Sequence, residues 1–126
     1  YAESIATQAV SSNALSPTAA QLIAGFLFVN GTATGAVQLN VPTAANIIAT
    51  LGPTIPFDGT YSEPIHVVNV NLGQTISLSA ADSNVTIVAA GTGAANTVAS
   101  NNVRKFILTV TSATTVSITS VGYWTL

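Results

Sequence analysis

The sequence predicts an all-β fold, a single antiparallel β-sandwich of jelly-roll-like type with two short helical turns. Apolar and polar residues alternate in short segments, as in VQLNV at 37–41 and TISLS at 75–79, and a period of two is typical of half-buried strands. Turn-forming residues separate these segments at short intervals. About eight strands joined in this way are typical of a sandwich, jelly roll or barrel. Parallel βαβ order is disfavoured, because the two helical patterns are short and both lie in the first half.

The first 15 residues are small and polar and lack a firm periodicity, with Ile5 and Val10 as the sizeable apolar side chains before Leu15. We therefore expect an N-terminal arm over residues 1–15, followed by a β-sandwich domain over residues 16–126. The arm is either a frayed terminus or a segment that docks on a neighbouring subunit through Ile5 and Val10, by adding a strand to an open edge.

Two segments with the same order of residues predict the helical turns. In SPTAAQLIAG, Ser16 can cap, Pro17 suits the first helical position and Gly25 can end the turn, which predicts a helix over about 17–24. PTAANIIATLG repeats this order and predicts a second helix over 43–51. The loop that follows, 53–64, contains three prolines, and loops of this length often carry specific contacts.

Alternation along the predicted strands also predicts which side chains point inward. The expected core consists of Phe28, Leu39, Val68, Val70, Ile76, Leu78, Ile87, Phe106, Leu108, Val110 and Ile118.

Charged residues make up 5% of the chain, with 2 Lys+Arg and 4 Asp+Glu, against roughly 25% in ordinary domains. The polar side chains are mostly neutral, so copies of the chain repel one another weakly and association is favoured. A net charge of -2 offers no footprint for nucleic acid or anionic lipid, and no apolar run reaches the roughly 20 residues of a membrane helix. The absence of cysteine excludes disulfides, thiolate catalysis and structural zinc. We expect no nucleic-acid or membrane partner.

His66 is the single histidine and lies in a predicted strand, IHVVN. Without a second histidine it predicts a structural role rather than a zinc site. The sequence contains no G-x-S-x-G, and one histidine with Asp58 or Asp82 is too little for a triad. We therefore expect no catalytic, cofactor-binding or metal-binding residues, no cofactor and no enzymatic activity.

The carboxylates Asp58 and Glu63 share one predicted loop. Paired carboxylates can cleave glycosides, but carbohydrate clefts usually need aromatic platforms, and this chain has one Trp, three Tyr and four Phe. A calcium site formed by Asp58, Glu63 or Asp82 is an alternative. Solvated loop charges are the favoured interpretation of all three.

Three further motifs are weak. Residues 91–96, GTGAAN, imitate a dinucleotide fingerprint without its third glycine or a following helix, and they predict a turn. Arg104-Lys105 is the sole basic pair and predicts protection of a strand from wrong pairing rather than a nucleic-acid patch. Asn30-Gly31-Thr32 and Asn84-Val85-Thr86 match glycosylation triplets, which arise often by chance in this composition.

Five segments in order carry a resemblance: SPTAAQLIAGF, LNVPTAANIIATL, HVVNVN, NVTIVAAGT and RKFILTVTSATTVSIT. Together they resemble β-rich structural proteins of large double-stranded DNA viruses and tailed phages, over about residues 16–121. The resemblance implies a component of a particle surface, a tail fibre or capsid decoration, with no catalytic residues to transfer. The loop 53–64 matches this family least, because Asp58-Gly59 reverses its usual glycine-aspartate turn.

Three functions remain open at this point. The leading expectation is a non-enzymatic structural protein of a virus particle surface, partnered by its own copies and by other capsid proteins; the resemblance implies a trimer. The second is a secreted cellular fibre or pilus subunit that assembles by N-terminal strand donation. The third is a carbohydrate-binding β-sandwich, which needs a surface cluster of Tyr61, Tyr123 and Trp124. The first two place the chain at a virion surface or outside the cell.

Overall fold

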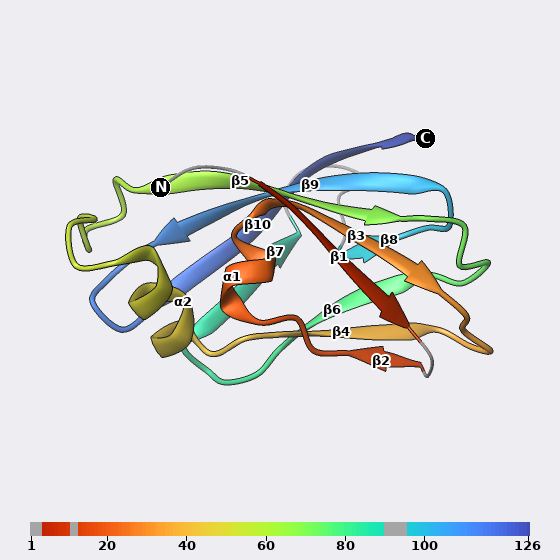
Figure 1. Ribbon diagram of the computed structural model, residues 1–126. Coiled ribbons are helices and arrows are strands. Elements are labelled where there is room, and N and C mark those ends of the chain that lie inside the picture. Colours follow the sequence, from red (N-terminus) through yellow and green to blue (C-terminus); the bar gives the residue numbers. More distant parts are fainter. Residues whose placement is uncertain (1–3, 11–12, 90–95) are drawn as a thin grey trace.

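The computed structural model describes residues 4–10, 13–89 and 96–126, and this part of the chain forms two β-sheets with two short helices at one end (Figure 1). One sheet has six strands in the order β1-β3-β5-β9-β10-β7, and the other has four in the order β2-β4-β6-β8. A single hydrophobic core lies between them. The elements are β1 (Ser4–Val10), β2 (Ala14–Leu15), α1 (Ala19–Leu22), β3 (Gly25–Gly31), β4 (Val37–Val41), α2 (Ala44–Leu51), β5 (Ser62–Asn69), β6 (Ile76–Ala80), β7 (Val85–Ala89), β8 (Thr97–Val98), β9 (Asn102–Val110) and β10 (Val116–Thr125).

Strand pairing is mixed rather than purely antiparallel. In the six-stranded sheet β3 is parallel to both β1 and β5, and β7 is parallel to β10, whereas β9 is antiparallel to β5 and β10. From β1 to β8 the chain alternates between the two sheets. Thus β2 and β4 are the crossovers for the parallel pairs β1/β3 and β3/β5, and β3 and β5 are the crossovers for the parallel pairs β2/β4 and β4/β6. The β-rich class with two short helices agrees with the sequence prediction, and the alternation between sheets explains the parallel pairs.

The two helices begin from the same four residues, PTAA, and are capped in the same way. The side chains of Thr18 and Thr43 accept hydrogen bonds from the backbone N–H of Gln21 and Asn46, each at 3.2 Å. Gln21 Oε1 accepts a bond from Thr18 N–H at 2.9 Å, which completes a capping box. The sequence predicted Ser16 as the first cap; the cap is Thr18, so the helix starts two residues later.

The segment predicted as an N-terminal arm completes the sheet of its own chain. Residues 4–10 form β1, in parallel register with β3 from the pair Ser4–Gly25 to the pair Val10–Gly31, and Ile5 lies opposite Phe26. Val10 is 3% exposed and belongs to the core, and its carbonyl accepts a bond from Thr32 N–H at 2.7 Å. In this structure the segment is therefore an integral edge strand.

Seven predicted core residues are buried between the sheets: Leu39, Ile76, Leu78, Phe106, Leu108, Val110 and Ile118. Ile87 is half-buried against them. The prediction for Phe28 is wrong, because Leu27 and Val29 point inward and Phe28 points outward. Residues 26–29 are all apolar, so alternation could not set the phase there.

Two other predicted core positions differ from the expectation. Val68 is buried, but it lies outside the core cluster, on the outward phase of β5. Val70 is 38% exposed, because β5 ends at Asn69 and the chain turns away from the sheet, with Asn71 at φ 54°. The alternation of apolar and polar residues thus continues past Asn69, where the strand ends, and this led to the wrong prediction for Val70.

Candidate functional site

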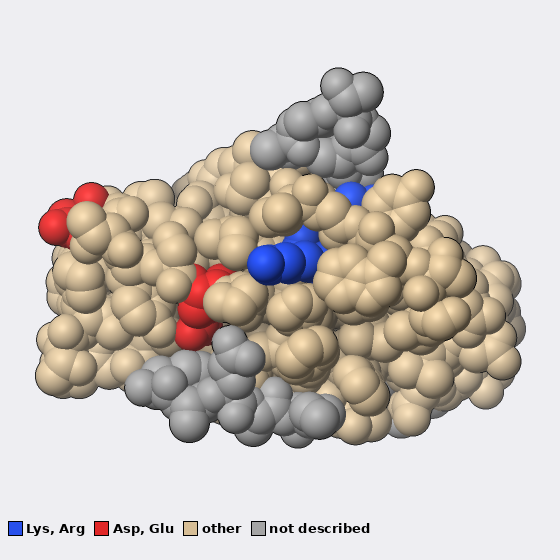
Figure 2. Space-filling view, turned by 90° about the horizontal axis from the view of Figure 1, so that it is seen from above, with Lys and Arg blue, Asp and Glu red and all other residues tan. Residues whose placement is uncertain are grey.

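Among the described residues, no helix or strand lies over the face of the six-stranded sheet that points away from the four-stranded sheet; we call this face the outer face. In Figure 2 it is seen from above and is almost entirely uncharged, with small blue and red patches. Its side chains occupy the strand positions that alternate with the core positions, including Phe26, Phe28, His66 and Trp124. Among the charged residues of its strands, the register turns Lys105 to this face and Glu63 and Arg104 toward the core.

Three aromatic rings meet on the outer face. Phe26 and His66 are register partners in β3 and β5 and stack with ring centroids 4.3 Å apart and planes 9° apart. Trp124 meets His66 edge-on at 5.9 Å. Val68 and Val103 share a register row with Phe28 and Trp124 on the outer face and are 4% and 2% exposed, so the apolar side chains of this face bury part of its own surface.

A β-bulge in β10 places Trp124 on this face. Val116, Ile118 and Ser120 point inward, and unbroken alternation would also turn Trp124 inward. The register shifts between Ser120 and Gly122, so that Trp124 pairs with Val103 on the outer face. Re-aiming a side chain is a usual effect of one extra residue in a strand.

His66 occupies a structural position. It is half-buried between Phe26 and Trp124, and its Nδ1 lies 3.1 Å from the carbonyl oxygen of Gly25. Within residues 4–10, 13–89 and 96–126, no three His, Cys, Asp or Glu side chains come together as a metal site would require.

The aromatic residues proposed as a carbohydrate platform are not brought together. Tyr61 precedes β5; its carbonyl accepts a bond from Val110 N–H and its hydroxyl donates to Glu63 Oε2 at 3.0 Å. Tyr123 lies toward the opposite end of β9, where its ring contacts the Arg104 guanidinium at 4.9 Å. Tyr123 and Trp124 are neighbours in one strand and therefore point to opposite faces.

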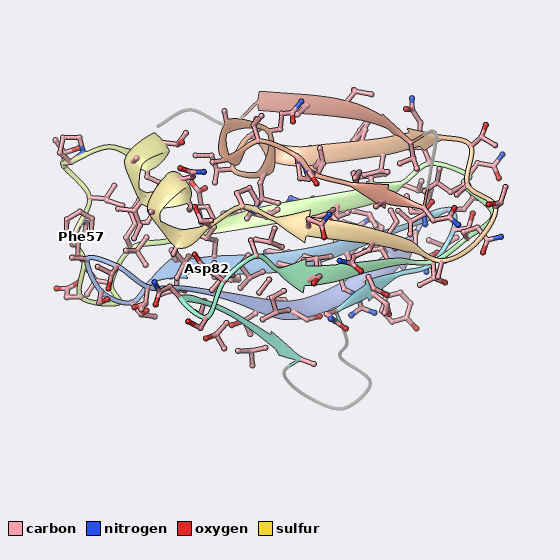
Figure 3. All side chains as sticks on the ribbon, turned by 90° about the horizontal axis from the view of Figure 1, so that it is seen from below. Phe57 and Asp82 are labelled. Atoms are coloured by element: carbon pink, nitrogen blue, oxygen red, sulfur yellow. The ribbon has the colours of Figure 1, made fainter. Side chains whose placement is uncertain are left out.

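The three carboxylates described are separate. Asp58 is fully exposed, and the hydroxyl and the N–H of Thr60 donate to its Oδ1 at 2.6 and 3.1 Å, which lowers the pKa of the Asp58 carboxyl. Glu63 is 9% exposed and points inward from β5. Asp82 accepts a bond from Asn84 N–H at 3.0 Å in the turn between β6 and β7, away from the loop that carries Phe57 (Figure 3).

The basic pair lies inside the sheet, so the prediction that it protects a strand edge is wrong: β9 runs between β5 and β10. Arg104 is 6% exposed, and its guanidinium donates to Thr97 O at 2.6 Å and to Ser120 Oγ at 3.0 Å. It ties β8 to β10. Lys105, the next residue, points to the outer face and is half-buried.

Sequence reasoning missed Asn69, the last residue of β5, which is fully buried. Its Nδ2 donates to Gln74 O at 2.8 Å and to Val98 O at 3.0 Å, and its Oδ1 accepts from Leu72 N–H at 3.3 Å. The alternation VVNVN suggested a solvent-facing asparagine. Gly73 indicates a tight turn shortly after Asn69, and such a turn can be held by an asparagine side chain that bonds its backbone groups, as Asn69 does here.

A groove of about 590 Å³ opens between the starts of the two helices. The first PTAA segment and the Pro-Thr of the second line it, together with Ser16 after β2, Asn40 near the end of β4 and Ala81 after β6. Asn40 Nδ2 donates to Ser16 Oγ at 3.1 Å within it. Its lining contains no charged side chain.

The glycine-rich segment 91–96 and the two glycosylation-type triplets, at Asn30 and Asn84, are the motifs that remain. Residues 91–95 of the GTGAAN segment lie outside the described residues. Asn30 is half-buried in β3, and Asn84 is exposed in the turn before β7. In the described ranges, neither helix has the length and apolar character of a membrane-crossing segment.

In comparisons with known proteins, no family model, curated protein or solved structure matches this chain.

Proposed function

We propose that this chain is a non-enzymatic structural subunit of a virus particle surface, as a capsid decoration, minor capsid or fibre component, and that it works as an assembly of copies. The observation that carries the proposal is a surface with almost no charge together with an aromatic sheet face that no other described element covers. Soluble monomers rarely expose large contiguous apolar patches, and net charge usually keeps them apart.

The size of the outer face fits an interaction surface. Six strands about 4.8 Å apart, with about eight residues each at about 3.3 Å per residue, give a face of roughly 600 Å², which approaches the ~800 Å² per partner of a standard interface. Trp124, Val121 and Val88 are 47%, 53% and 37% exposed on this side of the molecule. Large apolar side chains are thus available for contacts with neighbouring proteins of the particle.

We also propose that the two sheets form a jelly-roll-like sandwich. Two sheets around one core support it, and the parallel pairs depart from the usual antiparallel pattern. Assembly as a fibre by strand donation would require β1 to leave its own sheet, where Val10 is buried. The carbohydrate-binding reading loses support from the separation of Tyr61 from Tyr123 and Trp124.

The test is sedimentation analysis of the purified chain from about 5 to 500 μM, followed by electron microscopy of the assembled fraction. We expect a closed oligomer, with three copies as the number that the viral resemblance implies. A monomer throughout this range would overturn the proposal. A helical filament instead of a closed oligomer would favour the secreted fibre subunit.

A further inference from the structure

The two outermost strands of the six-stranded sheet, β1 and β7, lack the features that usually protect sheet edges. Natural edges carry charges, prolines or bulges, or they are very short. β1 (SIATQAV) and β7 (VTIVA) contain no charged residue and no proline, and each pairs with its neighbour in unbroken register. The edge strands of the four-stranded sheet, β2 and β8, are two residues long.

Both edges present backbone groups on their open side. In β7, the Asn84 carbonyl points toward β10, because it accepts a bond from Val116 N–H. The direction of the backbone N–H and C=O alternates along a strand, so these groups of Thr86 and Val88 also face β10, and those of Ile87 and Ala89 face away from the sheet. In β1, Val10 O accepts from Thr32 N–H beside β3. The same alternation turns the N–H and C=O of Thr7, at the middle of β1, away from the sheet.

The two edges also match in direction. β1, β3 and β5 are parallel, β9 reverses, and β10 and β7 reverse again, so β1 and β7 run the same way. A second copy in the same orientation can therefore set its β7 beside β1 as a parallel pair, the arrangement that each edge strand already has with its own neighbour.

We propose that copies of this chain join edge to edge, with β7 of one copy pairing in parallel with β1 of the next. This inference rests on the proposed function and names the contact that builds the assembly. Pairing β1 with β1, or β7 with β7, would leave the other edge open in every dimer. Pairing β7 with β1 uses both edges, and a ring of copies leaves neither exposed. Each contact is short, and closure of the ring multiplies it through avidity.

Charge favours an edge contact over a contact between two outer faces. Lys105 lies on β9, near the middle of the outer face, and the register places no described carboxylate beside it there. Two copies packed face to face would bury two lysines, and burying unpaired charges is costly. The edges carry no charge, and main-chain hydrogen bonds give a strand-addition contact its affinity.

The absence of cysteine allows a crosslinking test on the full chain. Thr7 and Thr86 are exposed, and the register places both side chains on the outer face, one on each edge strand. The variants Thr7→Cys and Thr86→Cys are treated with a short bifunctional thiol reagent, separately and as an equal mixture. We expect crosslinked dimers in the mixture at about ten times the yield of either variant alone. Crosslinking of one variant with itself, at the yield of the mixture, would overturn the inference.

A matched pair of substitutions separates edge from face. Val88→Lys places a charge on β7, and Val121→Lys places the same charge on β10, where the original valines are 37% and 53% exposed. We expect Val88→Lys to reduce the oligomer fraction about ten-fold and Val121→Lys to leave it unchanged. Val88 also lies on the outer face, so oligomers that dissociate with Val121→Lys, whether or not they survive Val88→Lys, would assign the contact to the outer face instead. A monomeric wild-type chain would overturn the proposed function as well.

Discussion

Phe106 is the most informative place to test the packing of the two sheets. It is fully buried on β9, in the middle of the six-stranded sheet, and points into the core. Phe106→Ala removes a buried aromatic ring, whose transfer from water contributes about 2–3 kcal/mol. A residual cavity of about 50–100 Å³ at about 24 cal/mol per Å³ adds about 1–2 kcal/mol. The expected loss in the free energy of unfolding is therefore about 3–5 kcal/mol.

Equilibrium unfolding in urea measures this loss. With a slope of about 1.5 kcal/mol per M, the unfolding midpoint should fall by about 2–3 M. Ile107→Ala is the matched control, because Ile107 is the next residue, is half-buried and points to the outer face; it should cost about 1 kcal/mol. A loss below about 1 kcal/mol for Phe106→Ala, or a larger loss for Ile107→Ala, would mean that the inward phase of β9 is misassigned.

Three further perturbations test single contacts. Gly31→Ala should destabilise the chain by at least about 2 kcal/mol and expose β1 to hydrogen exchange, because Gly31 has φ +110° and an added Cβ would lie 2.3 Å from Val10 O; full protection of β1 in this variant would contradict the contact. Asn69→Ala should lower the free energy of unfolding by about 2–4 kcal/mol, since the buried carbonyl of Val98 and the partly buried carbonyl of Gln74 lose their donor, and a urea midpoint near wild type would refute the role of this amide. The pKa of Asp58 is lowered by the Thr60 hydrogen bonds, so its stabilising contribution is present above the ordinary value of 3.8 and is lost as pH falls through the lowered value. Thermal unfolding of Asp58→Asn between pH 5 and 2 should therefore depend less on pH than that of the wild type, and an identical dependence would contradict this.

Local patterns were sufficient for most of the strands and for both helices. Alternation identified the inward side chains of β4, β6, β9 and the first half of β10; in β4, β6 and the first half of β10 polar residues separate the inward apolar ones, and in β9 Ile107 separates Phe106 from Leu108. The repeated PTAA segments indicated both helices, although the cap of α1 lies at Thr18. These features depend on neighbours in sequence, which is why the sequence alone is informative about them.

Features that depend on distant residues were not predictable from the sequence. β1 has the composition of a loose terminus, and its place beside β3 depends on the backbone approach at Gly31. The phase of Phe26 to Val29 depends on which sheet covers them, and the outward turn of Trp124 depends on a bulge opposite β9. The outer face and its aromatic cluster therefore follow from tertiary pairing. The composition predicted the lack of charge on this surface and left its location open.

The parallel pairs have a consequence for how the chain reaches its folded state. Phe26 pairs with His66 and Val37 with Ile76, each about forty residues apart in sequence, and folding slows when contacts join distant segments, to milliseconds or seconds in β-rich domains. During this time apolar strands without charged residues stay unpaired and can bind strands of other unfolded copies. Refolding yield should therefore fall steeply as the protein concentration rises, and synthesis at low temperature should favour the native chain.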